Sequence, residues 1–175
     1  MTCRLDARRR TPRILVCLLL LAAGCGYQPQ GMGGLPRGIQ RIHLVPLSNQ
    51  TFRPGLQGLV GAAILRRLQQ DGRVRVASEE AADAVMGGAL TAYENLPIAF
   101  DTNDVGRRFR VRIIFAMQVT ERGGGKVLLK AEIAGEAFYT TGSDVVGTRA
   151  AEEEADRRAV QDLAARVMAG LMEGL

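Results

Sequence analysis

This chain of 175 residues carries a net charge of +5, with 23 basic and 18 acidic side chains, three cysteines and one histidine. Residues 1–24 hold five arginines and one aspartate, so the remaining residues carry 18 basic and 17 acidic side chains and a net charge of only +1. A near-neutral domain lacks the basic stripe of nucleic-acid-binding proteins, which argues against nucleic acid as a partner. The length suits one domain with a sizeable core.

The beginning of the chain has the three parts of a secretory signal. Arginines precede an apolar run over residues 14–23, and small residues come directly before Cys25. Such a run is typical of a signal peptide and shorter than the roughly 20 residues of a membrane-spanning helix. The sequence predicts a lipoprotein signal peptide over residues 1–24.

The Ala-Ala-Gly-Cys sequence that ends at Cys25 resembles the lipobox of bacterial lipoproteins, although Ala22 stands where leucine is preferred. The resemblance implies a diacylglycerol on the Cys25 thiol and an acyl chain such as palmitate on its amino group, and no other cofactor. Gly26 stands where an aspartate would favour the inner membrane, which points to the outer membrane. The alternative is a soluble export signal. Because Cys3 and Cys17 leave with the signal, no disulfide is predicted, although an exported compartment would permit one.

Four glycines and two prolines in residues 28–38 predict a tether with little regular structure, so residues 25–38 are interpreted as a lipidated N-terminus and flexible tether. Residues 39–175 are predicted to form one folded domain. Alternating apolar side chains predict a strand over residues 40–45.

Helical spacing of apolar residues predicts a helix that starts near Pro54 and buries Leu56, Leu59, Val60, Ala63, Ile64 and Leu68. A second strand is predicted over residues 73–76 and a third over residues 85–96. Residues 97–106 hold several turn-forming side chains and are predicted to form an exposed loop.

The clearest alternation lies in residues 108–120, where large apolar side chains occupy the odd positions from Phe109 to Val119. Three glycines at residues 123–125 predict a tight turn into a returning strand. The turn sets a register in which four pairs face each other: Phe115 with Ile133, Met117 with Ala131, Arg112 with Glu136, and Gln118 with Lys130.

A long amphipathic helix is predicted over residues 150–171, with Val160, Leu163, Ala164, Val167, Met168 and Leu171 as its apolar stripe. Acidic and basic residues spaced four apart, such as Glu153 with Arg157, Glu154 with Arg158, and Asp162 with Arg166, predict a solvated opposite face. The predicted fold is therefore α+β, a two-layer sandwich with two amphipathic helices on one face of a roughly four-stranded sheet.

Five features follow one another along the chain: the mature start Cys25-Gly26-Tyr27, the Asn49-x-Thr51-x-x-Pro54-Gly55-Leu56 helix opening, the Ala82-Asp83-Ala84-Val85-x-Gly87 strand entry, the long hairpin and the final helix. In this order, they resemble the lipopolysaccharide-assembly lipoprotein family LptE. The resemblance implies a non-enzymatic lipoprotein on the periplasmic side of the outer membrane. It implies that the protein forms a plug inside the LptD β-barrel, assists barrel assembly and contacts lipopolysaccharide.

Candidate lipopolysaccharide-binding residues are Arg108, Arg110, Arg112 and Lys130, which share one face of the hairpin. Arginine forks match phosphate and carboxylate oxygens, so this row suits the phosphates or inner sugars of lipopolysaccharide. The alternative is an ordinary solvent face, partly neutralised by Glu132 and Glu136.

Catalytic and metal-site patterns are absent from the sequence. His43 stands alone without a partner nucleophile, and no histidine or cysteine cluster has metal-ligand spacing. Two other functions stay open: a lipoprotein that activates a peptidoglycan synthase, which needs a longer tether, and a generic envelope-stability lipoprotein. A coil of about 13 residues reaches only about 20 Å on average, which favours a partner at the membrane.

Overall fold

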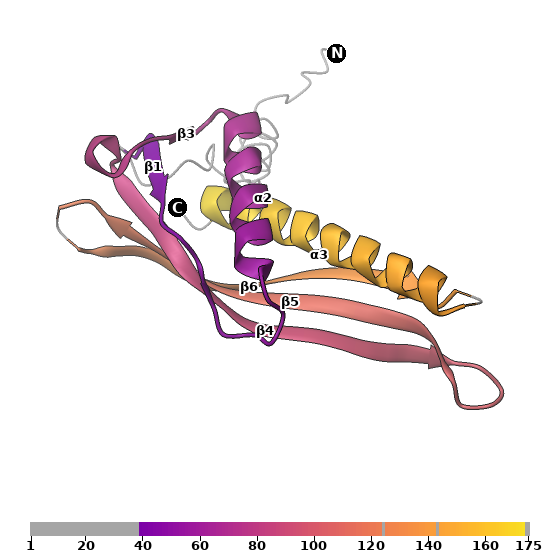
Figure 1. Ribbon diagram of the computed structural model, residues 1–175. Coiled ribbons are helices and arrows are strands. Elements are labelled where there is room, and N and C mark those ends of the chain that lie inside the picture. Colours follow the sequence, from indigo (N-terminus) through magenta and orange to yellow (C-terminus); the bar gives the residue numbers. More distant parts are fainter. Residues whose placement is uncertain (1–38, 124, 143, 174–175) are drawn as a thin grey trace, which may run out of the picture. The chain divides into compact units, whose positions relative to one another are not determined.

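A computed structural model of the chain describes residues 39–123, 125–142 and 144–173 (Figure 1). The predicted signal peptide, Cys25 and the tether lie outside these residues. In chain order the elements are β1 (Arg41–Leu44), β2 (Ser48–Asn49), α2 (Leu56–Asp71), β3 (Arg75–Val76), the 3-10 turn η1 (Glu79–Ala81), β4 (Ala84–Phe100), β5 (Gly106–Glu121), β6 (Val127–Thr140) and α3 (Val145–Glu173).

The strands form one mixed sheet of six strands in the order β3-β1-β4-β5-β6. Strand β2 pairs with the same edge of β4 as β1, a few residues further along β4. The pairs that involve β1, β2 or β3 are parallel, whereas β4, β5 and β6 pair antiparallel. The predicted α+β class is confirmed, but the prediction of about four strands is wrong. Strand β2 was missed because two residues are too few to produce an alternating pattern, whereas β3 lies within the strand predicted over residues 73–76.

The hairpin register is confirmed. Phe115 faces Ile133 and Arg112 faces Glu136, as the turn predicts, and the other two predicted pairs also form. A register shift between Val119 and Thr120 brings Thr120 opposite Val127, so the pairing next to the turn differs from the prediction by one residue. An extra residue in one strand is a β-bulge, which increases the local twist without changing the body of the ladder.

Strand β4 continues into the first four residues of the segment predicted as an exposed loop over residues 97–106. It ends at Phe100, and only residues 101–105 connect it to β5. Its parallel partners pair with it only up to Leu90, so the rest of β4 is an edge strand within the described residues. An edge tolerates Pro97, which lacks an N–H, and a register shift follows it directly.

Helix α2 buries Leu56, Val60, Ala63, Ile64 and Leu68, as predicted. Leu59 is the exception, because 57% of its surface is exposed. Helix α3 begins at Val145, five residues earlier than predicted. The side chain of Asp144, the residue before the helix, accepts a hydrogen bond of 2.6 Å from the N–H of Gly147. Such a contact is an N-terminal cap and satisfies one of the free N–H groups of the first turn.

The apolar stripe predicted for α3 is buried in full. Of the three predicted ion pairs along α3, Asp162–Arg166 forms at 2.8 Å and the other two are wrong. Arg157 pairs with Glu154 at 2.7 Å, and Glu153 pairs with Arg149 at 3.3 Å. The Arg158 guanidinium instead donates a hydrogen bond of 2.8 Å to the carbonyl of Phe138 on β6.

Buried residues from α2, α3 and strands β1, β4, β5 and β6 form one hydrophobic cluster. This cluster agrees with the expectation that both helices lie against the same face of the sheet. Gly135 permits close contact between β6 and α3, since a Cβ atom there would lie 2.4 Å from both the Ala159 carbonyl oxygen and the Leu163 Cβ. The odd-numbered residues of β5 from Val111 to Val119 belong to the cluster, so its even-numbered residues lie on the opposite, outer face.

Candidate functional site

Three arginines on β5 lie on the outer face of the sheet. Arg108, Arg110 and Arg112 occupy even positions between buried residues, and we call them the arginine row. Alternation of side chains along a strand places all three on the face opposite the hydrophobic cluster. The structure therefore confirms that these three predicted residues share one surface.

The cross-strand neighbours of the arginine row differ in charge. Arg112 lies between Glu94 of β4 and Glu136 of β6, whereas Arg110 lies between Leu96 and Phe138. Residues directly opposite each other on one face of a sheet are in contact range. The row therefore has a compensated end at Arg112 and an uncompensated end at Arg110 and Arg108.

The Arg112 charge is offset by an ion pair. Its Nε lies 3.2 Å from Glu136 Oε1, at an angle that makes the contact electrostatic and not a hydrogen bond. Both side chains are about one-third exposed. A ligand phosphate at Arg112 would have to compete with this carboxylate.

The other end of the row combines positive charge with apolar surface. The Arg108 guanidinium carbon lies 5.3 Å from the centre of the Phe138 ring, within the range of a cation–π contact. Arg110 Nε is shielded from solvent and has no hydrogen-bond partner within the described residues. Leu96 and Phe138 are 48% and 41% exposed. We call Leu96, Arg108, Arg110 and Phe138 the amphipathic patch.

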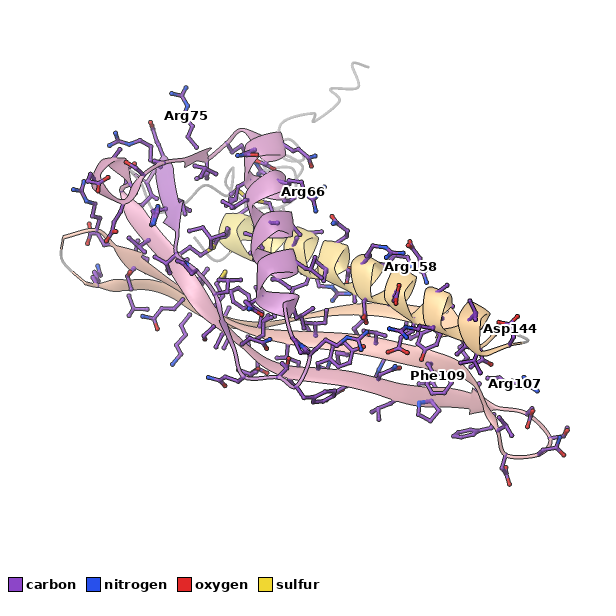
Figure 2. All side chains as sticks on the ribbon, in the orientation of Figure 1. Arg66, Arg75, Arg107, Phe109, Asp144 and Arg158 are labelled. Carbon is purple, nitrogen blue, oxygen red and sulfur yellow. The ribbon has the colours of Figure 1, made fainter. Side chains whose placement is uncertain are left out.

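Further exposed apolar side chains lie beside the patch at the same end of the sheet. Arg107 at the start of β5 and Asp144 before α3 lie close to this end (Figure 2). The exposed apolar residues of these segments are Ile98, Phe100, Val105, Val145 and Val146. Exposed apolar side chains that gather in one place, next to polar groups, are a mark of interaction sites. The sequence signal that could have found it is the continued apolar character of residues 96–100.

Lys130 lies on the same outer face but far from the arginine row. It faces Gln118, six residues along β5 from Arg112, which corresponds to about 20 Å. The structure therefore brings together the three predicted arginines. Lys130 is too far away to bind the same small ligand group as they do.

A hollow of about 480 Å³ lies where the edge of β6 meets α3. Its lining includes Arg108, Phe138 and Thr140 from the hairpin and Glu154 and Arg158 from α3. Two guanidinium groups therefore border one hollow from two different elements. The surface available to a ligand continues from the amphipathic patch around the edge of the sheet.

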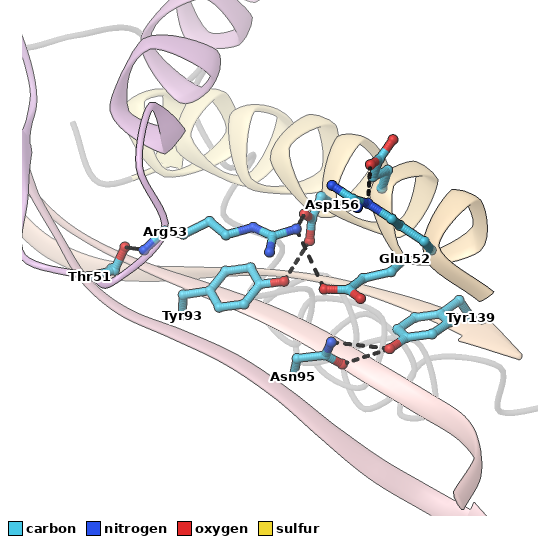
Figure 3. Close-up of polar contacts among 9 residues, drawn as sticks. Thr51, Arg53, Tyr93, Asn95, Tyr139, Glu152 and Asp156 are labelled. Atoms are coloured by element: carbon cyan, nitrogen blue, oxygen red, sulfur yellow. Dashed lines mark hydrogen bonds and ion pairs between the residues drawn. The ribbon is translucent and has the colours of Figure 1, made fainter. Parts of the chain in front are cut away.

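A separate polar cluster joins α3 to the segment before α2 (Figure 3). Asp156 accepts a hydrogen bond of 2.8 Å from the Tyr93 hydroxyl and forms an ion pair with Arg53, and Arg53 also lies 3.5 Å from Glu152. Burial and the hydrogen bond to Asp156 raise the pKa of Tyr93. The partners in this cluster satisfy one another, so its chemistry is that of a structural link.

The Asn49-x-Thr51 motif has a structural role in the same region. The Asn49 side chain accepts hydrogen bonds from the Thr51 N–H and hydroxyl, at 3.0 and 2.8 Å, and donates to the Arg53 carbonyl at 2.8 Å. These bonds fix the turn that leads into α2 and direct Arg53 toward Asp156.

The single histidine has a structural contact. His43 Nδ1 lies 3.0 Å from the carbonyl oxygen of Ala77, which joins β1 to the segment after β3. No group of three or more metal-ligating side chains in the described residues is arranged to hold a metal ion. None of the described helices is both long and apolar enough to cross a bilayer.

The family model described as LptE, Lipopolysaccharide-assembly, matches residues 39–171. The match covers nearly all of the described part of the chain, including β4, the hairpin and most of α3. Among curated proteins, none matches this chain.

Several solved structures share the fold at low sequence identity. A protein from Xanthomonas campestris has a TM-score of 0.56 at 11% identity, over 81% of this chain and 90% of its own. A minor lipoprotein from Acinetobacter baumannii has a TM-score of 0.54 at 16% identity, over 77% and 91%. Lipoprotein B from Nitrosomonas europaea has a TM-score of 0.54 at 18% identity, over 82% and 90%. Identities this low establish the fold alone.

Proposed function

Because this chain belongs to the lipopolysaccharide-assembly family LptE, we propose that it is an outer-membrane lipoprotein that binds lipopolysaccharide and forms a plug complex with an LptD-type β-barrel. In this role it assists the assembly of the barrel and the transfer of lipopolysaccharide to the outer leaflet. The anchor is the lipid on Cys25, and the domain acts by binding and not by catalysis.

The amphipathic patch is the observation that carries the lipopolysaccharide part of the proposal. Lipopolysaccharide joins phosphate groups to apolar chains, and the patch sets the guanidinium groups of Arg108 and Arg110 beside Leu96 and Phe138. Guanidinium groups bind phosphate oxygens in a bidentate manner, and these two have no carboxylate opposite them in the sheet. Arg112 and Lys130 are assigned secondary roles, since Arg112 is paired and Lys130 lies about 20 Å away.

Lipopolysaccharide capture tests the assignment of the arginine row. The variant R108S/R110S/R112S is expected to retain at least tenfold less lipopolysaccharide than the wild type in a pull-down, because each charged hydrogen bond to phosphate contributes about 1.5–3 kcal/mol. The matched control is R149S/R157S/R166S, which loses the same charge from three exposed positions on α3. Equal retention by both triple variants would reject the assignment.

Co-purification tests the barrel partnership independently. After mild detergent extraction, the acylated protein is expected to elute with a large β-barrel protein, and the R108S/R110S/R112S variant is expected to keep this partner. Elution of the wild-type protein without any barrel would contradict the plug role while leaving lipopolysaccharide binding as a separate question.

A further inference from the structure

The described chain begins at one end of the sheet, which we call the anchor-side end. It consists of the start of β1, strand β3, the η1 turn, the last turns of α2 and the β5–β6 turn (Figure 1). Hydrogen bonds join these segments. Asp83 accepts from the N–H groups of Gln40 and Arg41 at 3.0 and 2.9 Å, its carbonyl accepts from Arg122 N–H at 3.0 Å, and Arg75 N–H donates to the Gln40 carbonyl at 2.9 Å.

Positive charge gathers at this end although the described residues as a whole are neutral. Residues 39–173 contain 17 basic and 17 acidic side chains. The anchor-side end has two more basic than acidic residues. The basic residues are Arg41, Arg66, Arg67, Arg73, Arg75, Arg122 and Lys126, and the acidic residues are Asp71, Glu79, Glu80, Asp83 and Glu121.

Two of these carboxylates are already engaged. Asp83 forms an ion pair of 2.7 Å with Arg41, and Asp71 forms one of 2.5 Å with Arg73. The remaining basic side chains form no ion pair within the described residues, and we call them the anchor-side cations: Arg66, Arg67, Arg75, Arg122 and Lys126. The Arg75 side chain extends away from the strands (Figure 2).

The position of the predicted lipid limits how far this end can lie from a membrane. Cys25 precedes Ile39 by 14 residues, which span at most about 50 Å even when fully extended. The connection therefore holds the start of β1 within about 50 Å of the leaflet that carries the lipid of Cys25. Attraction between exposed cations and an anionic surface acts over about 8–10 Å at physiological salt. It therefore acts on the anchor-side cations whenever the tethered domain approaches the membrane surface.

We propose that the anchor-side cations dock this end of the domain on anionic phospholipid headgroups. This inference rests on the lipid anchor of the proposed function. In the docked state, the amphipathic patch lies far from the headgroups, since Leu96 follows Ala84 by twelve residues along β4, or about 40 Å. Docking thus keeps the lipopolysaccharide-binding surface available to an incoming ligand while the domain waits for its barrel.

Energy transfer on vesicles tests the docking. The acylated protein, purified from membranes and carrying a donor dye at S78C, is reconstituted into phosphatidylcholine vesicles with or without phosphatidylglycerol, each with an acceptor-labelled headgroup lipid. Ser78 is exposed and lies directly before η1 at the anchor-side end. We expect higher energy transfer with phosphatidylglycerol and a return to the neutral-vesicle value at high salt.

Charge variants identify the residues responsible. R75Q/R122Q/K126Q is expected to lose the phosphatidylglycerol effect, because each cation near an anionic surface changes the docked-to-undocked ratio about fivefold. R149Q/R157Q/R166Q removes the same charge from α3 and is expected to keep the effect. Equal transfer in both vesicle types, or equal loss in both variants, would overturn the docking.

Flotation separates failure of the docking from failure of the anchor. If the protein floats with neutral vesicles but shows no phosphatidylglycerol effect, the docking is wrong and the anchor stands. If the protein does not float with neutral vesicles, the lipid anchor is wrong and the docking proposal falls with it.

Discussion

Two groups of arginines in this protein have opposite surroundings. Arg53 lies beside two carboxylates, Asp156 and Glu152, in a network that links the start of α2 to α3. Arg108 and Arg110 face apolar side chains and Thr140 across the strands and have no ion pair within the described residues. An arginine paired inside the fold links the elements that carry its partners, and removal of one partner leaves a costly unpaired charge. An arginine held over apolar surface without a counter-ion keeps its charge for a ligand.

The largest expected effect lies in the compensated group. D156A should lower the free energy of unfolding by about 3 kcal/mol, because it leaves the partly buried Arg53 and the Tyr93 hydroxyl without their main partner. Chemical denaturation measures the change. E154A, which removes an exposed ion pair with Arg157, is the matched control and should cost less than about 0.5 kcal/mol. Equal losses in the two variants would contradict the structural role of the cluster.

Phe138 tests the apolar part of the uncompensated group. F138S should weaken lipopolysaccharide binding about fivefold, because it removes the ring beneath the Arg108 guanidinium and part of the apolar surface. V127S is the control, since Val127 is also an exposed apolar residue of β6 but lies next to the turn. Isothermal titration of both variants measures the difference, and an unchanged affinity in F138S would remove Phe138 from the site.

Glu136 offers a test in the opposite direction. E136Q should strengthen lipopolysaccharide binding about twofold, because it frees Arg112 from an ion pair that is partly exposed and therefore weak. E132Q, on the same strand and face, removes a carboxylate that has no ion pair within the described residues and should change the affinity less. A loss of affinity in E136Q would show that Glu136 supports the site instead of competing with the ligand.

The smallest effect concerns the exposed Arg41–Asp83 pair and its pH dependence. Hydrogen bonds from Arg41 and from the Gln40 N–H lower the pKa of Asp83 to about 2, below its ordinary value near 4. A lowered pKa in the folded state contributes stability above about pH 4, and this contribution disappears as the pH falls toward 2. D83N should lack this component, and denaturation curves between pH 6 and 2 compare the two proteins. If the stability of D83N fell with pH in parallel with that of the wild type, the lowered pKa of Asp83 would be contradicted.

Much of the fold follows from local patterns in the sequence. Strand β5 has a continuous period of two and a glycine turn after it, so both its faces and its pairing with β6 could be predicted. The buried stripe of α3 follows in the same way from helical spacing. The order of motifs also indicated the family, which the match over residues 39–171 confirms.

Other features depend on contacts between distant residues. Strand β2 has only two residues and exists because β4 lies beside it, and β4 passes Pro97 because that part of it is an edge. The exposed position of Leu59 depends on which neighbours cover α2, which helical periodicity alone does not specify.

For the candidate site, the sequence indicated the arginine row but not its division into a compensated end at Arg112 and an uncompensated end at Arg108 and Arg110. The ion pair of Arg112 with Glu136 follows from the predicted register, and so do Leu96 and Phe138 opposite Arg110 once β4 is paired with β5. The exposed Ile98 and Phe100 at the same end come from the extension of β4 into a segment predicted as a loop. Lys130 was grouped with the arginines because they share a face, and distance along the strand separates them. The polar cluster around Asp156 joins residues about a hundred positions apart and left no local signal.

The most direct measurement compares two double variants with the same loss of charge. R108S/R110S removes the uncompensated arginines, and R112S/K130S removes the paired arginine and the distant lysine from the same face. Equilibrium titration with lipopolysaccharide should show a loss of at least tenfold in affinity for the first variant and about twofold for the second. Equal losses, or a larger loss in R112S/K130S, would contradict the central claim that uncompensated arginines beside apolar surface form the binding site.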